Sequence, residues 1–247
     1  EEGPSDENGL ENVLDKAPWL AESEFAVVLE PTDLAVELGC NGAMNADLGF
    51  EGKAAHSARP WLGENAVTKA GAWLAEMHDR QPDPVTIDGL EFREVFSVTR
   101  AEGGIANNVL PATLRINLNY RFPPLYSIEE AEQRLLETAA AADWVVVKDR
   151  AAAGAVVKEN PHLDRLMAIS GAARQAKQGW TDVARLSGRG IAAINYGPGD
   201  PSLAHQAAES VALSSVDRAF DVLRAFLVDG REDSSEELAQ LLGDDED

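Results

Sequence analysis

Hydrophobic and polar positions along the chain alternate between helical and strand-like periodicity. Helical spacing of apolar residues covers residues 65–80, 127–142, 160–177 and 215–228. Strand-like runs cover residues 25–30, 45–56, 91–104, 112–122, 143–150 and 191–197. Helical and strand segments that replace one another along a chain are typical of a mixed α/β protein, and this pattern predicts that class.

The middle of the chain has a regular order of elements. From residue 45 to 150 the order is β-α-β-β-α-β, the split βαβ or ferredoxin-like pattern, and it predicts a four-stranded sheet with two helices on one face. Ser127 and Glu130 match a capping box at the start of the second helix. The segments before residue 45 and after residue 150 each lack a complete set of strands. We therefore expect them to be two parts of one α/β domain, interrupted by a compact insertion.

Composition narrows the range of partners. The chain has 43 acidic and 21 basic residues among 247, a formal net charge of −22, which repels nucleic acid and anionic membrane surfaces. We expect no nucleic-acid partner and no membrane partner. Cys40 is the one cysteine, which excludes an intrachain disulfide and favours a reducing cytoplasm. The acidic run at 231–247 is typical of a solvated tail.

Glu30 and His205 each lie at or after the end of an apolar strand, a position at which α/β proteins often bind ligands. Glu30 ends the apolar strand 25–30, and α/β proteins place ligands at the carboxyl ends of their strands. His205 follows a loop rich in glycine and proline after the apolar strand 191–197. Carboxylate and imidazole together suit zinc, and a further glutamate could act as general base on a metal-bound water. Taken singly, each is more often a surface or loop residue.

Five segments in a fixed order carry a resemblance to a known family. They are "EE" (1–2), "LEPTD" (29–33), "GFEGKAAHSARPWLGENAV" (49–67), "GGIANNVLPATLRINLNYRFPP" (103–124) and "GWTDVARLSGRGIAAINYGPGDPSLAHQAAE" (179–209). The chain resembles the di-zinc amidohydrolases that include the aminoacylases, acetylornithine deacetylase and succinyl-diaminopimelate desuccinylase. The last segment is most similar to desuccinylases of actinobacterial type.

The resemblance implies an architecture and a mode of assembly. A partial zinc-peptidase-like catalytic domain, residues 1–44 and 151–230, would be interrupted by a ferredoxin-like lid and dimerisation domain, residues 45–150. An acidic tail, residues 231–247, would follow. The resemblance also implies a homodimer formed through the lid, a small N-acyl amino acid as substrate, and two zinc ions, with cobalt as an alternative.

The same resemblance gives roles to five acidic or imidazole residues. Glu1 matches the general base that takes a proton from the attacking water and passes it to the leaving amine. Glu2 and His205 match ligands of one zinc, and Glu30 matches a ligand of the other. His56 matches a lid histidine that reaches the partner subunit's site and stabilises the oxyanion.

Substrate-binding positions also follow from the resemblance. They are Asn107, Asn108, Arg121, Thr181, Asp182, Arg185, Gly197 and Gly199. Simple turn chemistry would equally explain the two asparagines, and a surface strand end would explain the arginine. Glycine in the loop at 197–199 allows the backbone to approach a ligand closely.

One departure from the family pattern concerns the ligand set. The family has a His-x-Asp motif and a later bridging aspartate before the Glu-Glu pair, and this chain starts at that pair. His78 and His162 lie in predicted helices and neither begins a His-x-Asp. A catalytic zinc normally takes three protein ligands. We therefore expect the chain by itself to bind zinc weakly and to be a poor hydrolase.

Three functions remain open at this stage. The first is hydrolysis of the amide bond of N-succinyl-LL-2,6-diaminopimelate in lysine and diaminopimelate biosynthesis. The second is another N-acyl-amino-acid deacylase or a dipeptidase of the same family. The third is a non-catalytic dimerisation or binding protein that kept the lid without the metal centre.

Overall fold

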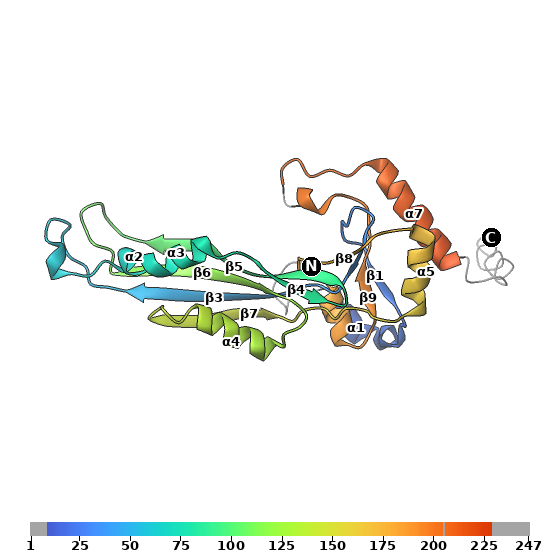
Figure 1. The fold of residues 1–247 in the computed structure, drawn as a ribbon, viewed down its shortest axis with the longest axis horizontal. Coiled ribbons are helices and arrows are strands. Elements are labelled where there is room, and N and C mark those ends of the chain that lie inside the picture. The colour runs from blue at the N-terminus through green and yellow to red at the C-terminus, as the bar shows by residue number, and fades with distance from the viewer. Residues whose placement is uncertain (1–8, 205, 229–247) are drawn as a thin grey trace, which may run out of the picture.

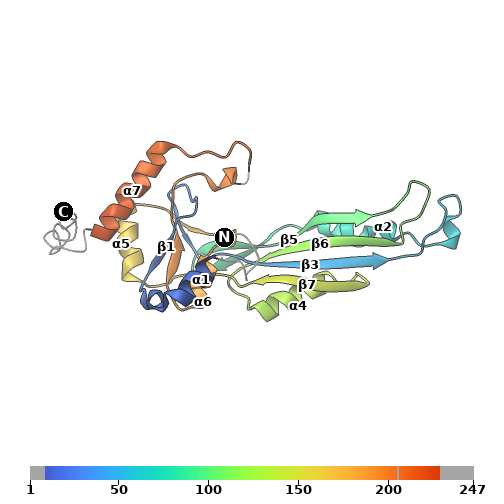
Figure 2. The same cartoon turned by 180° about the vertical axis from the view of Figure 1, so that it is seen from behind.

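A computed structural model describes residues 9–204 and 206–228, and it shows an elongated molecule with two β-sheets (Figure 1). The five-stranded sheet has the order β4-β5-β6-β3-β7, and the four-stranded sheet has the order β1-β9-β2-β8. Figures 1 and 2 show the larger sheet extending along the molecule, away from the smaller one. The mixed α/β class, with a lid inserted into a second domain, is confirmed.

The larger sheet belongs to the insertion and is antiparallel throughout. Its strands are β3 (Gly42–Glu51), β4 (Asp83–Ile87), β5 (Leu90–Gly103), β6 (Thr113–Phe122) and β7 (Trp144–Ala151). Strand β3 pairs with β6 from Gly42 opposite Phe122 to Glu51 opposite Thr113, without interruption. The sheet therefore runs the full length of the insertion.

One face of this sheet is covered by helices. They are α2 (Ala66–Lys69), α3 (Gly71–Asp79) and α4 (Ile128–Thr138). Alternate residues of β6 point toward these helices, so that Leu118, Tyr120 and Phe122 are fully buried in one cluster with Trp73 and Leu135. The predicted capping box at the start of α4 is confirmed. The predicted helix over 65–80 is divided into α2 and α3, and together with α4 these helices form the layer on one face that the sequence pattern predicted.

The prediction of four strands in this sheet is wrong, because β4 was missed. Its sequence, Asp-Pro-Val-Thr-Ile, is short and contains a proline, which weakens a strand pattern. Asp88 and Gly89 join it to β5 with positive φ angles of 49° and 79°. An Asp-Gly pair of this kind is a strong hairpin signal and could have revealed the strand.

The smaller sheet joins both sides of the insertion. Its strands are β1 (Ala26–Val28), β2 (Val36–Leu38), β8 (Arg174–Ala176) and β9 (Ala193–Asn195). Strand β9 pairs parallel with β1 and antiparallel with β2, while β8 pairs parallel with β2. We call the part of the molecule built on this sheet the host domain.

Four helices pack against the host sheet in two hydrophobic clusters. The helices are α1 (Gly9–Lys16), α5 (Pro161–Ser170), α6 (Val183–Gly188) and α7 (Leu213–Val228). Helices α5 and α7 belong to one cluster, and α1 and α6 belong to the other. The predicted helix over 160–177 is wrong in its second half. Gly171 adopts a left-handed conformation with φ 60° and ends the helix, and residues 174–176 then pair with β2.

Insertion and host domain are joined at two places. The chain enters and leaves the insertion side by side, where Cys40 and Gly154 exchange two backbone hydrogen bonds of 3.2 and 2.9 Å. The start of β5 also reaches into the host domain, because Leu90 and Phe92 are buried in its core beside Leu38. The insertion is therefore less self-contained than its element order indicated.

Candidate functional site

Glu30 lies just beyond the carboxyl end of β1, in a turn formed by residues 29–35. Its side chain is half-buried. The turn faces the loop at 197–199, and a Cβ atom added at Gly197 would lie 2.5 Å from the carbonyl oxygen of Glu30. Such a distance is far inside van der Waals contact, so a side chain at position 197 would displace the Glu30 backbone. The structure thus brings together Glu30 and the predicted pocket residues Gly197 and Gly199.

A buried polar cluster lies beside this turn. Lys177 forms a 2.8 Å ion pair with Glu37, and the side chains of both are about one-tenth exposed. The Lys177 ammonium also lies 3.5 Å from the carbonyl oxygen of Pro31. Asn195 is opposite Glu37 across β9 and β2, is fully buried, and has no amide hydrogen-bond partner among the described residues. Buried, incompletely satisfied polar groups are concentrated at functional sites. The sequence analysis missed this cluster, because each member sits in a three-residue strand or beside one.

The predicted pocket residues at the start of α6 lie against α1. Arg185 forms ion pairs with Glu11 at 3.2 Å and with Asp182 at 3.4 Å, and it lies over the ring of Trp180. Thr181 is 3% exposed. The pKa of Glu11 is lowered, chiefly by its hydrogen bond with Arg189 and against the opposing effect of burial. These contacts hold α6 to α1, and a substrate role for the three predicted residues remains a prediction.

His56, Asn107 and Asn108 lie together at the opposite end of the insertion. The loops at 52–65 and 104–112 form this insertion tip, where His56 bridges to Val109 and the amide of Ser57 donates to the carbonyl oxygen of Asn108 at 2.9 Å. The Nδ1 atom of His56 accepts from the amide of Ala58 at 3.1 Å. Figure 1 shows the tip at the far end of the molecule from the host sheet. The structure does not bring His56 near Glu30 of the same chain.

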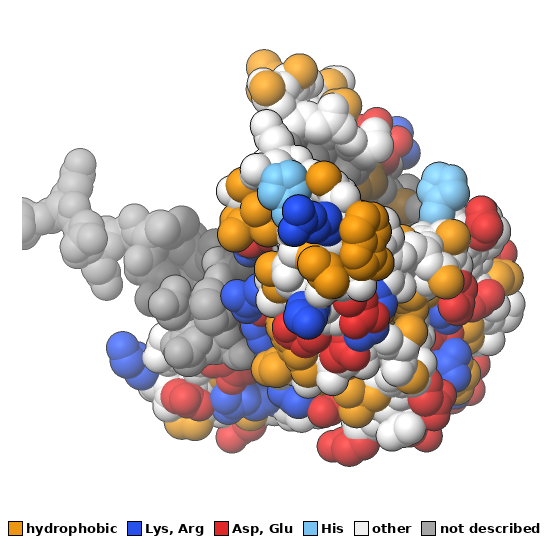
Figure 3. All heavy atoms as spheres, turned by 90° about the vertical axis from the view of Figure 1, so that its left-hand side faces the viewer, with side chains coloured by type: hydrophobic (Ala, Val, Ile, Leu, Met, Phe, Trp, Pro, Cys, Tyr) orange, Lys and Arg blue, Asp and Glu red, His pale blue; other side chains and the backbone are white. Residues whose placement is uncertain are grey.

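Large hydrophobic side chains are exposed at the insertion tip. Trp61 is 75%, Leu62 55% and Ile105 88% exposed. Figure 3 looks at this end of the molecule and shows hydrophobic side chains at its front, next to a histidine and basic side chains. Clustered exposed apolar residues of this size mark surfaces that contact another molecule.

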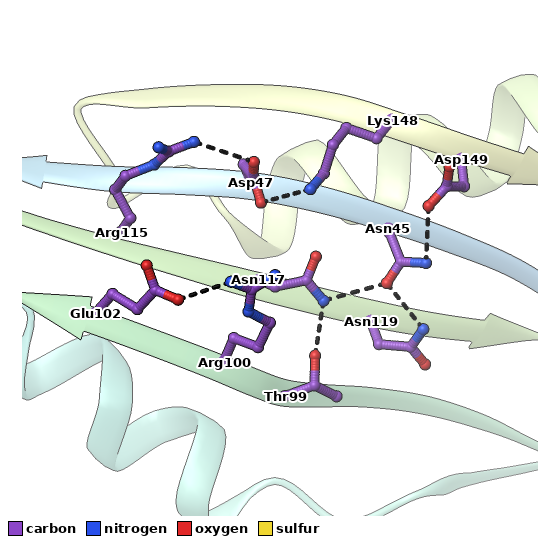
Figure 4. A network of polar contacts seen from close by, with 10 residues as sticks. All are labelled: Asn45, Asp47, Thr99, Arg100, Glu102, Arg115, Asn117, Asn119, Lys148 and Asp149. Carbon is purple, nitrogen blue, oxygen red and sulfur yellow. Dashed lines mark hydrogen bonds and ion pairs between the residues drawn. The ribbon is translucent and has the colours of Figure 1, made fainter.

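Arg121 lies on the face of the larger sheet that carries no helices. Its Nε atom donates to the side-chain oxygen of Asn119 at 3.2 Å. The side-chain amides of Asn117 and Asn119 on β6 both donate to the side-chain oxygen of Asn45 on β3, forming a cluster of amides across two neighbouring strands (Figure 4). A carboxylate-binding role for Arg121 remains a prediction.

The same face carries a mixed charge cluster. Asp47 pairs with Lys148 at 2.8 Å and with Arg115 at 3.3 Å (Figure 4). The hydrogen bond with Lys148 is the largest cause of the lowered pKa of Asp47. Opposite charges therefore neutralise one another on this face.

The predicted metal centre falls mostly on residues that the structure does not describe. Glu1, Glu2 and His205 lie outside the described residues, so Glu30 alone of the predicted ligands can be placed. Within residues 9–204 and 206–228, no group of three or more His, Cys, Asp or Glu side chains is arranged to hold a metal ion. Within the same ranges, no helix has the length and apolar character needed to cross a membrane.

Comparison with known proteins identifies the relatives of the chain. Residues 38–143 match the family described as Peptidase dimerisation domain. A protein assigned as a succinyl-diaminopimelate desuccinylase in Mycobacterium tuberculosis is 40% identical over 228 residues, which cover 92% of this chain and 64% of the relative. The chain is therefore similar in sequence to succinyl-diaminopimelate desuccinylases over most of its length. The desuccinylase of Corynebacterium glutamicum is 35% identical over 226 residues, which cover 89% of this chain and 61% of that protein. The resemblance expected from the sequence is confirmed, and the chain spans less than two thirds of the length of these two desuccinylases.

Solved structures agree with the fold. A tripeptidase from Staphylococcus aureus has a TM-score of 0.65 at 16% identity, covering 82% of this chain and 56% of the tripeptidase. An M20 family metallo-carboxypeptidase from Sulfolobus solfataricus has a TM-score of 0.64 at 14% identity, covering 88% of this chain and 66% of the carboxypeptidase. At these identities the likeness establishes the arrangement of the two domains and nothing about substrate.

Proposed function

We propose that the chain is the larger part of a metal-dependent hydrolase that cleaves the amide bond of an N-acyl amino acid, with N-succinyl-LL-2,6-diaminopimelate as substrate. The observation that supports this proposal is the similarity to two desuccinylases over about nine-tenths of the chain. The sequence identity with these two desuccinylases is 35–40%, and it extends through both the host domain and the insertion. For this reason we propose a shared function as well as a shared fold.

The proposed metal centre holds two zinc ions. Glu30 would ligate one ion, and Glu2 and His205 the other. The position of Glu30 fits this role, because it follows the carboxyl end of a strand in an α/β sheet and its backbone is fixed against Gly197. When bound, the metal would polarise the scissile carbonyl and lower the pKa of a water molecule. Glu1 would accept the proton of that water and deliver it to the leaving amine.

The substrate site is proposed to be shared between two copies of the chain. His56, Asn107 and Asn108 belong to the loops of the insertion tip, which lie at the far end of the molecule from strand β1, the strand that precedes Glu30 (Figure 1). The exposed Trp61 and Ile105 beside them favour contact with another molecule. We infer a homodimer in which the insertion tip of each copy brings His56 to the oxyanion at the other copy's metal centre.

A different acyl-amino-acid deacylase or a dipeptidase is the second candidate. Fungal proteins named probable carboxypeptidase are 36% identical over 106 residues, 40% of this chain. This shorter match supports common ancestry of part of the chain but gives less support to a carboxypeptidase substrate. A direct comparison of N-succinyl-diaminopimelate with an N-acetyl amino acid and a dipeptide separates the candidates.

The first experiment measures amide hydrolysis with zinc or cobalt present. Two proteins are compared, the 247-residue chain and a fusion that adds the portion of the Mycobacterium tuberculosis desuccinylase that the chain does not match. We expect the fusion to hydrolyse N-succinyl-diaminopimelate and the variant Glu30→Ala to lose at least about a hundredfold in kcat/KM. Glu22→Ala, which changes an exposed glutamate, is the matched control. A folded fusion without hydrolysis of this substrate would refute the proposal.

The second experiment tests the shared site by mixing two inactive variants. In a mixed dimer of Glu30→Ala and His56→Ala variants of the fusion, one site has both an intact Glu30 and an intact His56 from the other copy. Random exchange of subunits should therefore restore about a quarter of the wild-type activity. If His56 acts within its own chain, mixing restores none.

A further inference from the structure

One buried hydroxyl links the Glu30 turn to the loop at 197–199. Thr32 is 3% exposed, and its Oγ1 atom lies 2.6 Å from the carbonyl oxygen of Ala35 and 3.2 Å from that of Gly197. The amide of Gly197 donates to the same Oγ1 atom at 3.1 Å. A hydroxyl has one proton, which we assign to the shorter contact with Ala35. The Thr32 hydroxyl thus accepts a hydrogen bond from the loop at 197–199 and donates one within its own turn.

The turn that Thr32 holds is strained. Asp33 and Leu34 have φ angles of 51° and 63°, a left-handed conformation that residues other than glycine rarely adopt. Such strain persists only where the surroundings hold it, and it is concentrated at functional sites. Here the amide of Asp33 donates to Gly199 at 2.8 Å and the amide of Leu34 donates to Gly197 at 3.0 Å. The turn is therefore fixed by its contacts with the neighbouring loop.

We infer that Thr32 is a positioning residue for Glu30. Gly197 contacts both the Thr32 hydroxyl and the Glu30 backbone, so the hydroxyl sets where the Glu30 carboxylate is presented. The loop at 197–199 leads in sequence to His205, the predicted ligand of the other metal. Two ions that share a site must lie about 3.5–4 Å apart, so the two loops must keep a fixed separation. This consequence for the metal pair rests on the proposed function, whereas the link between the loops does not.

Three variants separate the role of the hydroxyl from general stability. Thr32→Val keeps the shape of the side chain and removes the hydroxyl, which leaves the amide of Gly197 buried without its acceptor. Thr32→Ser keeps the hydroxyl and tests rescue. Ser170→Ala is the matched control, because Ser170 is 9% exposed and its hydroxyl accepts from the amide of Ala172 at 3.2 Å at the end of α5, a contact that involves neither the turn nor the loop at 197–199.

The first readout is amide hydrogen exchange, measured by NMR on the metal-free 247-residue chain. We expect Thr32→Val to speed exchange at Gly197 and Leu34 by about tenfold and to shift the backbone resonances of Glu30. Thr32→Ser should stay within about threefold of the wild type, and Ser170→Ala should leave these positions unchanged. Unchanged exchange and unchanged resonances in folded Thr32→Val would overturn the link between the loops.

The second readout is the affinity for Zn²⁺ of the fusion described above, which adds the portion of the Mycobacterium tuberculosis desuccinylase that the chain does not match, measured by competition with a chromophoric chelator. We expect Thr32→Val to weaken the Glu30-dependent site by about ten- to a hundredfold, the loss typical when a group that orients a metal ligand is removed. Thr32→Ser should restore it. If Thr32→Val loosens the turn and leaves a Glu30-dependent affinity unchanged, the hydroxyl is structural only and the positioning role is refuted.

Failure of the proposed function gives a different result. In that case Glu30→Ala has no effect on Zn²⁺ affinity, which contradicts a metal centre at Glu30 in this chain. The exchange data would still decide whether Thr32 fixes the position of Glu30.

Discussion

The buried ion pair between Glu94 and Arg134 offers a quantitative test of the insertion core. The Glu94 side chain is 2% exposed and accepts from Arg134 through two hydrogen bonds of 2.8 and 2.6 Å. The Tyr120 hydroxyl donates to the same carboxylate at 2.6 Å. Arg134→Met removes the cation and leaves the carboxylate buried with Tyr120 as its remaining hydrogen-bond donor among these contacts.

The expected loss in the free energy of unfolding depends on how exposed Glu94 and Arg134 are. Removing one partner of a fully buried ion pair costs about 3–5 kcal/mol, because the other charge stays buried without compensation. The Arg134 side chain is 40% exposed, so solvent already screens part of the attraction. We therefore expect Arg134→Met to lower the free energy of unfolding by about 2–3 kcal/mol. For a chain of this size, the melting temperature should fall by about 5–10 °C.

The effect should depend on pH. Burial by itself would raise the pKa of Glu94, but the hydrogen bonds from Arg134 and Tyr120 outweigh burial and the pKa is lowered. A lowered pKa contributes stability that is present above the unfolded value of about 4.3 and is lost as pH falls through the folded value. Without Arg134, burial is opposed only by the Tyr120 hydrogen bond and the charge of Arg80 among these groups, so the pKa of Glu94 rises relative to the wild type. The stability difference between variant and wild type should therefore be largest near neutral pH and be already smaller at about pH 4, because it shrinks as pH falls through the higher pKa of the variant.

Urea unfolding monitored by tryptophan fluorescence at several pH values measures this difference. The double variant Glu94→Gln/Arg134→Met is the control, because it removes both charges and should recover part of the lost stability. A loss that is the same at pH 4 and pH 7, with no recovery in the double variant, would refute the reasoning.

Two further predictions concern packing in the described residues. Gly49→Ala should destabilise the chain by about 1–3 kcal/mol, because its Cβ would lie 2.2 Å from the ring of Trp144. Gly71→Ala should stabilise helix α3 by up to about 1 kcal/mol, because its Cβ would meet nothing within 4 Å. Urea unfolding monitored by tryptophan fluorescence measures both changes. The pKa of the Cys40 thiol is raised by burial, so a disulfide reagent should label native protein slowly and urea-unfolded protein fast; rapid native labelling would contradict its burial.

The parts of the fold that were predictable have long, regular patterns. The capping box at Ser127 and the alternation of apolar residues in β6 are local signals, and both appear in the structure. Strands β2 and β8 are three residues long and form only because distant segments pair with them. The equally short strands β1 and β9 lie in apolar runs that a local pattern can mark, whereas β8 is Arg-Gln-Ala and has no such run, which is why the helix over 160–177 was extended too far.

The candidate site also consists of residues that the sequence could reveal and of contacts that it could not. Glu30 could be singled out because it follows an apolar run, and the structure places it at the end of β1. The Lys177–Glu37 pair and the bridging hydroxyl of Thr32 depend on contacts between residues more than 100 positions apart. Contacts of that kind carry no periodic signal and need the three-dimensional structure.

The adjacent entrance and exit of the insertion bear on how such an architecture arises. Because Cys40 and Gly154 are hydrogen-bonded neighbours, the insertion is equivalent to one long closed loop in the chain of the host domain. The entropy of closing a loop rises only with the logarithm of its length, so the host tolerates a long insertion almost as well as a short one. A ferredoxin-like unit can therefore be gained, exchanged or lost at this point without rebuilding the host sheet. Leu90 and Phe92 add apolar contacts with the host core, and a grafted unit would need side chains that replace them.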